Sequence, residues 1–132
     1  MTEEPPPLFT SVGCWKDTGN RAIATLEGQD SRLDGSYGSR ETPIQKCYEA
    51  AKERGFKYFA VQNGGWCASS ATAADTYKKY GEANNCRDGE GGGWANDVYK
   101  INDGKFHAKT CIFVYCRRHC VILLPLIDLK PL

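Results

Sequence analysis

The chain has 132 residues, a formal net charge of +1 and seven cysteines. A chain of this length is expected to form one domain with a modest core. Its charges are balanced and spread along the chain, without the basic stripe that collects phosphates, which argues against nucleic acid as a partner. Seven cysteines in so short a chain are typical of disulfide-stapled proteins from oxidising compartments.

The first eight residues are polar and proline-rich, and we expect residues 1–8 to form a disordered lead. They have neither the basic region nor the apolar region of a signal peptide. The cysteines favour secretion more strongly than this start opposes it, so we expect an extracellular protein. The chain is then either one domain of a longer secreted protein or an incomplete gene product.

The first strand is predicted over residues 9–16 and contains Cys14 and Trp15. Residues 17–41 follow, with four glycines and many polar side chains, and are predicted to form a long loop. Within this loop, Ala22 and Ile23 are expected to form a short element that anchors it.

A helix is predicted over residues 43–54. Thr42 is expected to cap its first turn, Pro43 suits the first helical position, and Gln45 can complete a capping box. Gly55 is expected to end the helix in the left-handed conformation. The apolar face of this helix repeats at helical spacing and consists of Ile44, Cys47, Tyr48 and Ala51.

Two further strands complete the predicted sheet. An aromatic and β-branched run over residues 56–62 predicts a strand directly after the helix. The closing strand is predicted over residues 95–101, where neighbouring side chains point to opposite faces. Residues 68–83 fit a short helix or an ordered loop equally well. The predicted fold class is therefore α+β, a small disulfide-stapled antiparallel β-sheet with one main α-helix packed across it.

The order and spacing of several motifs resemble the WSC domain, a cysteine-rich extracellular carbohydrate-binding module related in shape to PAN/apple domains. The matching segments lie within residues 10–101 and are Val12–Asp17, Asn20–Ile23, Pro43–Cys47, Gly55–Gln62 and Gly64–Cys67. WSC domains usually have two further cysteines where this chain has Ala51 and Ser69. The resemblance implies that these two positions are adjacent in space and that one disulfide of the family is missing here.

Two disulfides are predicted. A bridge between Cys47 and Cys67 is the simplest way to join the helix to the segment after the strand, and Cys86 is the natural partner of Cys14. On these boundaries residues 9–102 form a WSC-like domain, and residues 103–132 form a C-terminal extension that packs loosely or is an artefact of the gene model. The extension has no counterpart in the resemblance. Its apolar run at 121–127 is shorter than the ~20 residues of a membrane span.

Metal binding is a weaker alternative. A zinc-dependent intracellular protein would need ligands from the extension, although their spacing fits no finger pattern. These residues are His107, Cys111, Cys116, His119 and Cys120. We expect no metal and no other cofactor, and the sequence shows no oriented Cys/His pair of the kind that nucleophilic catalysis needs.

Trp66 and Trp94 are the candidate ligand-binding rings, because each follows glycines that leave a neighbouring ring face uncovered. Trp15 lies within a strand and is expected to pack in the core. Core packing remains the alternative for all three rings, and turn formation the alternative for their polar neighbours. The candidate polar partners are Asn85, Asn96 and Asp97.

The resemblance implies a non-catalytic module that binds extracellular glycan or polysaccharide. The competing hypothesis is an extracellular protein–protein interaction module, in the manner of PAN/apple domains and receptor-borne WSC domains. Sugar binding predicts a concave site with an exposed ring beside amides and carboxylates. Protein binding predicts a broad apolar patch of several hundred Å².

Overall fold

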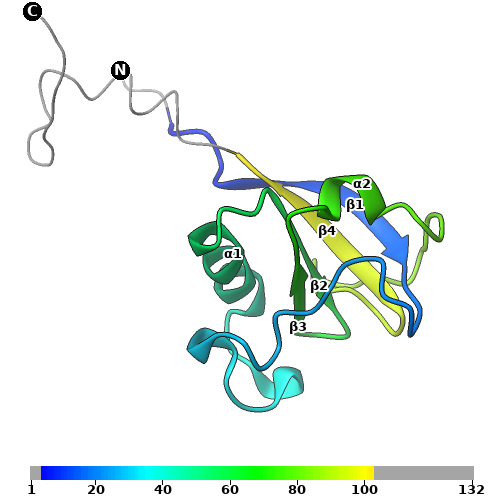
Figure 1. Ribbon diagram of the computed structural model, residues 1–132, viewed down its shortest axis with the longest axis horizontal. Coiled ribbons are helices and arrows are strands. Elements are labelled where there is room, and N and C mark those ends of the chain that lie inside the picture. Colours follow the sequence, from blue (N-terminus) through cyan, green and yellow to red (C-terminus); the bar gives the residue numbers. More distant parts are fainter. Residues whose placement is uncertain (1–3, 103–132) are drawn as a thin grey trace, which may run out of the picture. The chain divides into compact units, whose positions relative to one another are not determined.

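The computed structural model describes residues 4–102, which form a four-stranded antiparallel sheet and two α-helices (Figure 1). The strands are β1 (Phe9–Lys16), β2 (Tyr58–Gln62), β3 (Trp66–Ser69) and β4 (Ala95–Ile101), and the α-helices are α1 (Pro43–Glu53) and α2 (Ala73–Thr76). Two short 3-10 helices, Ser31–Leu33 and Tyr37–Ser39, lie in the long loop. The strand order is β1-β4-β2-β3. The predicted α+β fold is confirmed, with β3 as an additional strand at the sheet edge.

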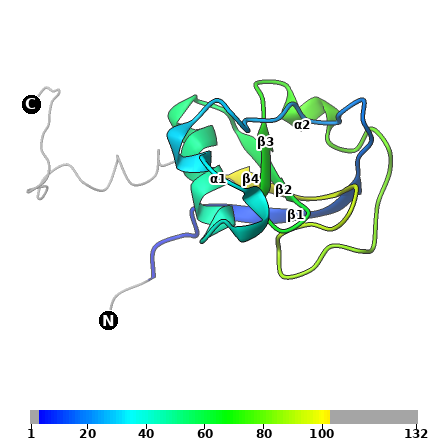
Figure 2. The same ribbon diagram turned by 90° about the horizontal axis from the view of Figure 1, so that it is seen from below.

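The two α-helices lie on opposite faces of the sheet (Figures 1 and 2). Alternate side chains of each strand point to opposite faces, so the sheet separates two apolar layers. Phe59 and Tyr99 belong to the layer beneath α1 and stack with their ring centroids 5.0 Å apart. Ala60 belongs to the other layer, together with Ala22 and Ile23 from the long loop. The expected anchoring role of this pair is therefore confirmed.

Helix α1 begins without the predicted side-chain cap. A capping side chain reaches the first free N–H groups from an extended backbone. Thr42 instead has a φ of 45°, in the left-handed region, and its hydroxyl makes no capping bond. Gln45 donates to Glu49 at 3.0 Å, so it forms no capping box. The predicted end is correct, because Gly55 has a φ of 77° and its N–H donates to the carbonyl of Lys52 at 2.9 Å.

Both predicted disulfides are present. Cys14 in β1 is bonded to Cys86 in the loop before β4, with 6.0 Å between their Cα atoms. Cys47 in α1 is bonded to Cys67 in β3, with 5.5 Å between their Cα atoms. One bridge therefore fixes the helix to the sheet, and the other fixes the loop that leads into the last strand.

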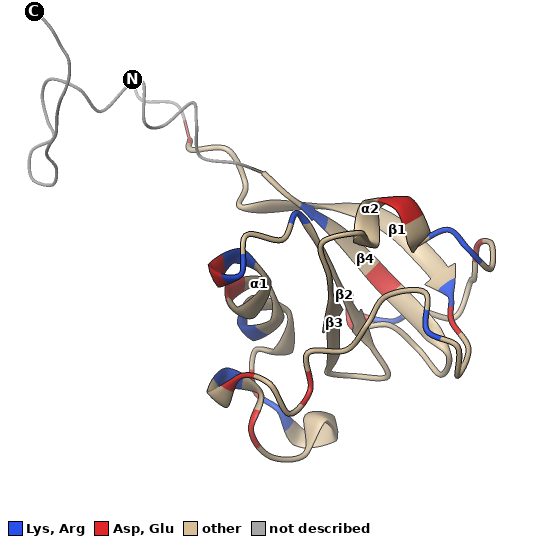
Figure 3. Cartoon of the chain, in the orientation of Figure 1, with Lys and Arg blue, Asp and Glu red and all other residues tan. Residues whose placement is uncertain are grey.

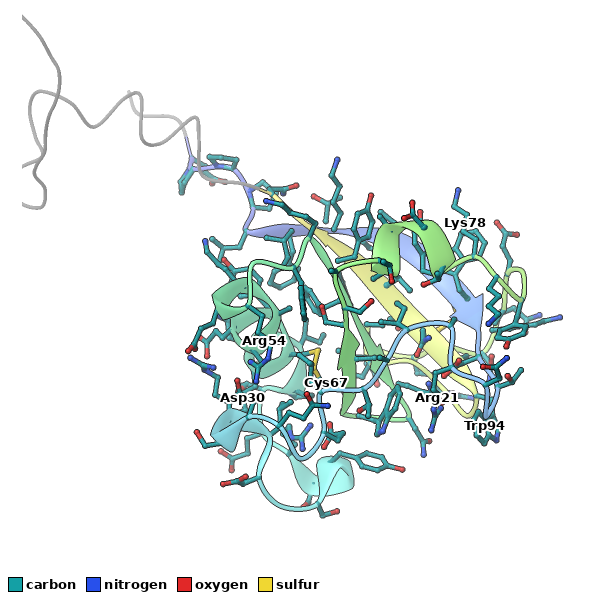
Figure 4. The ribbon with its side chains drawn as sticks, viewed as in Figure 1. Arg21, Asp30, Arg54, Cys67, Lys78 and Trp94 are labelled. Carbon is teal, nitrogen blue, oxygen red and sulfur yellow. A yellow bond between two sulfur atoms is a disulfide. The ribbon has the colours of Figure 1, made fainter. Side chains whose placement is uncertain are left out.

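Ion pairs hold the long loop in place. Arg40 has a side chain that is only 2% exposed, and its two terminal nitrogens donate to the carboxylate of Glu27 at 2.7 and 2.8 Å. Arg54 at the end of α1 donates to Asp30 at 2.6 Å, and Figure 4 shows these two side chains meeting. The loop is polar because its order depends on paired charges as well as on a few buried apolar residues.

Acidic and basic residues are interspersed over the ribbon, and neither sign gathers on one face (Figure 3). Within residues 4–102 no group of three or more His, Cys, Asp or Glu residues is placed to hold a metal ion. No helix in this part of the chain is long and apolar enough to cross a membrane. The expectations for residues 103–132, including the candidate zinc ligands and the apolar run, lie outside the described residues.

Candidate ligand-binding site

A row of paired positions crosses the sheet on the face opposite α1. The strand register pairs Trp15 with Asn96, Asn96 with Gln62, and Gln62 with Trp66. Directly opposed residues in antiparallel strands share a face. Trp66 therefore lies on the same face as Asn96, whereas Asp97 points to the α1 face, because successive strand residues alternate.

Arg21 brings the two predicted tryptophans together. Its guanidinium carbon lies 4.2 Å from the ring centroid of Trp66 and 4.9 Å from that of Trp94. Both distances are within the range of a cation–π interaction. Figure 4 shows Arg21 close to Trp94 at one end of the sheet. We call this group, Arg21 with Trp66 and Trp94, the Arg-Trp cluster.

Arg21 is also tied to a buried polar network centred on Asp17. The carboxylate of Asp17 accepts from Arg21 Nη1 at 2.9 Å, from the backbone N–H of Ala22 at 2.8 Å and from Gln62 Nε2 at 2.9 Å. Burial alone would raise the pKa of Asp17, but the hydrogen bonds outweigh it and hold the pKa below its usual value. Asp17 is therefore ionised at neutral pH, and its buried carboxylate holds the guanidinium of Arg21.

Asn96 belongs to this network and is fully buried. Its Oδ1 accepts from Gln62 Nε2 at 2.8 Å, and its Nδ2 has no partner among the described residues. The side chain that the sequence offered as a polar partner of a ligand thus lies within the core. Asn96 supports the network and does not present its amide to the solvent.

Trp94 is presented to solvent by a tight turn. Gly92 and Ala95 exchange two backbone hydrogen bonds of 3.0 and 3.1 Å around it. Trp94 has a φ of 53°, a left-handed conformation that is an outlier for a bulky residue, and it is 55% exposed. The ring is therefore held at the surface by a backbone conformation that its own side chain disfavours.

This turn is braced from two sides. Asn85 Nδ2 donates to the carbonyl of Gly93 at 3.1 Å, and the N–H of Asp17 donates to the carbonyl of Trp94 at 2.9 Å. Asn85, the second predicted polar partner, is exposed and lies beside the turn. Cys86, which directly follows Asn85, is fixed by its disulfide to Cys14.

A shallow polar depression of about 480 Å³ adjoins the same turn. Its lining includes Asn63, Asn85, Arg87, Asp88 and Glu90. The lining also includes three consecutive glycines that directly precede Trp94, which we call the glycine run: Gly91, Gly92 and Gly93. Amide, carboxylate and guanidinium groups therefore lie within the reach of any molecule that covers this turn.

The glycine run has two roles. A Cβ on Gly91 would lie 2.3 Å from the carbonyl oxygen of Val61, and one on Gly92 would lie 2.1 Å from that of Asn85. These two glycines allow the loop to pack closely against its neighbours. Gly93 has no atom within 4 Å of such a Cβ. Only this last glycine, next to Trp94, faces open space.

Asp97 stabilises the loop from the α1 face. Its carboxylate accepts from the N–H of Gly91 at 2.8 Å, and burial raises its pKa, with this hydrogen bond opposing the rise. Burial, together with the charges of Asp97 and Glu90, raises the pKa of Tyr99 to about 12. These contacts of Asp97 are on the face of the sheet opposite Trp66, so Asp97 holds the loop and does not lie beside that ring.

Trp15 packs as expected. It is half-buried, its Nε1 donates to the carbonyl of Val12 at 3.0 Å, and its ring meets that of Tyr77 edge-on at 5.4 Å. The structure brings Trp94, which is exposed, together with Trp66, which is only half-buried and packs against the apolar layer opposite α1. Asn85 lies beside the turn of Trp94, Asn96 is buried, and Asp97 points to the α1 face. Comparison of the chain with protein-family models, with curated proteins and with solved structures finds no match.

Proposed function

We propose that residues 9–102 form an extracellular, non-catalytic glycan-binding module of the WSC type. The observation that carries the proposal is the exposed ring of Trp94, held on a braced turn beside polar groups. Sugar rings combine an apolar C–H face with hydroxyl groups around the rim. A flat aromatic face beside a few fixed hydrogen-bonding groups is complementary to that pattern.

The polar partners differ in part from those that the sequence offered. Asn85 is exposed and uses its Nδ2 on the turn, which leaves its carbonyl oxygen available to accept from a hydroxyl. Arg21 supplies further N–H donors beside the ring. Because the turn is already ordered, a ligand that stacks on Trp94 loses little free energy in fixing the protein.

The alternative, a protein-interaction module, is less well supported by the described surface. Such a module needs a contiguous apolar patch of several hundred Å². Among residues 4–102 the exposed large hydrophobic side chains are Leu8 and Trp94. One exposed ring surrounded by polar groups fits a sugar better than it fits a protein partner. The two disulfides fit an oxidising compartment, and secretion is part of the proposal.

The test is retention of the full chain, produced in an oxidising host, on a panel of immobilised neutral and charged polysaccharides. We expect wild type to be retained by at least one polymer and Trp94→Ala to elute in the void. Trp15→Ala is the matched control, because it removes an equal ring from a packing position. We expect this control to lose about 3 kcal/mol of stability and to bind normally below its melting temperature. Normal retention of Trp94→Ala, or no retention of wild type on any polymer, would refute the proposal.

A further inference from the structure

Most of the N–H donors of the Arg21 guanidinium make no hydrogen bond to the described residues. Its Nη1 donates to Asp17, and this is its one hydrogen bond within the described residues. A guanidinium carries five N–H donors. The Arg21 side chain is 33% exposed, so part of this donor set faces solvent.

The charge that this ion pair presents at the surface is positive. The side chain of Asp17 is 0% exposed, whereas that of Arg21 is 33% exposed. Asp17 also accepts from Ala22 and Gln62, so its negative charge is shared among donors inside the protein. A ligand above the Arg-Trp cluster therefore meets the cation, with the anion beneath it.

The position of Arg21 is fixed before any ligand arrives. Two indole rings lie against the guanidinium, at 4.2 and 4.9 Å, and the carboxylate of Asp17 holds one nitrogen. A guanidinium is planar, and its fork of N–H groups matches the oxygens of a carboxylate or a sulfate. The ordering of a flexible arginine, which normally opposes binding, has already taken place here.

We propose that the ligand of this module is an acidic glycan, and that Arg21 selects it by hydrogen bonding to a carboxylate or sulfate on a sugar beside Trp94. The inference rests on the proposed glycan binding and adds the chemical class of the sugar. Arg21 then acts as the specificity-determining residue, while the exposed ring of Trp94 supplies stacking that charged and neutral sugars share.

The test compares polymers that differ only in charge, using the full chain and calorimetry. One pair is polygalacturonate and the same polymer after reduction of its carboxyl groups. The other is a sulfated galactan and its desulfated form, so the two pairs distinguish a carboxylate from a sulfate. We expect the charged member of at least one pair to bind roughly 10-fold more tightly, as loss of a charge-assisted hydrogen bond predicts. The preference should weaken as salt is added.

Substitutions of Arg21 test whether this residue causes the preference for charged polymers. We expect Arg21→Gln to bind the charged and neutral members of the pair equally, and Arg21→Lys to keep part of the preference. Lys78→Gln is the charge-matched control, since Lys78 lies over Trp15 and Tyr77 and is well away from Arg21 in Figure 4. This control should retain the full preference.

Equal binding of charged and neutral polymers by wild type would overturn the inference and leave glycan binding intact. Binding only to neutral polymers of the wider panel would have the same meaning. If wild type binds no polysaccharide at all, the proposed function fails as well. An Arg21→Gln variant that is folded and keeps the full preference would show that another residue recognises the anion.

Discussion

The left-handed backbone at Trp94 allows the effect of backbone strain on stability to be measured separately from the effect of the side-chain contacts. Trp94 has a φ of 53°, which any residue with a Cβ disfavours. Trp94→Gly and Trp94→Ala both remove the indole, but only glycine adopts this conformation freely. We therefore expect the glycine variant to be the more stable of the two, although glycine is normally the more destabilising replacement.

The magnitudes follow from exposure and backbone geometry. Trp94 is 55% exposed, so a little under half of its surface is covered, and deletion of the ring should cost about 2 kcal/mol in both variants. An alanine retains a left-handed penalty of about 1–2 kcal/mol, against which the extra flexibility of unfolded glycine counts about 0.5–1 kcal/mol. The glycine variant should therefore be more stable by about 0.5–1 kcal/mol.

Thermal unfolding of the two variants with intact disulfides measures this difference. A gap of that size corresponds to a melting temperature roughly 4 °C higher for Trp94→Gly in a domain of about 100 residues. Both variants should lose glycan binding equally, because both lack the ring. If Trp94→Ala melts at the higher temperature, the turn does not hold residue 94 in the left-handed conformation, and the bracing by Asp17 and Asn85 is misjudged.

Three further predictions concern stability and covalent structure. Asp17 has a lowered folded pKa, so its stabilising contribution is present above the unfolded value of about 3.9 and is lost as pH falls through the folded value. Asp17→Asn should therefore flatten the acid limb of melting temperature against pH, and an unchanged limb would contradict the network. Ala51→Cys combined with Ser69→Cys should form a third disulfide, and two free thiols by mass spectrometry would count against the WSC alignment. A chain that ends at Asn102 should keep one cooperative melt, because the N–H of Asn102 closes the described hydrogen bonding on Leu8; loss of that melt would show that residues 103–132 complete the core.

Local signals in the sequence were sufficient for most of the fold. The helix face through Cys47, the aromatic run that became β2 and the glycine that ends α1 all express short-range preferences, and these elements were predicted. Strand β3 was missed because it has four residues and follows a turn directly, so its period is too short to recognise. The predicted cap at Thr42 was wrong because the backbone of Thr42 is left-handed and not extended, and its hydroxyl makes no capping bond.

The candidate site was predicted only in part, for a different reason. The glycines beside Trp66 and Trp94 predicted two exposed rings, but only Trp94 is exposed, and Trp66 is half-buried. Arg21 and Asp17, which lie near these rings, come from a distant loop with no regular period. Their local signals are the spacing of four residues that joins them as an ion pair, next to the buried anchor at Ala22, and their place in two of the segments that resemble the WSC domain. Strand alternation did separate Asn96 from Asp97, but it could not show that Asn96 is the buried member.

The strand order also constrains when this protein can fold during synthesis. Strand β4 is the last described element to leave the ribosome, yet it lies between β1 and β2 at the centre of the sheet. Helix α1 and the β2–β3 pair are contiguous in the chain, and Cys47 and Cys67 are only 20 residues apart, so this half can assemble and be oxidised early. Strand β1 has no partner in the sheet until β4 has been synthesised. The apolar residues of β1 are therefore exposed to non-native contacts in the nascent chain until that point.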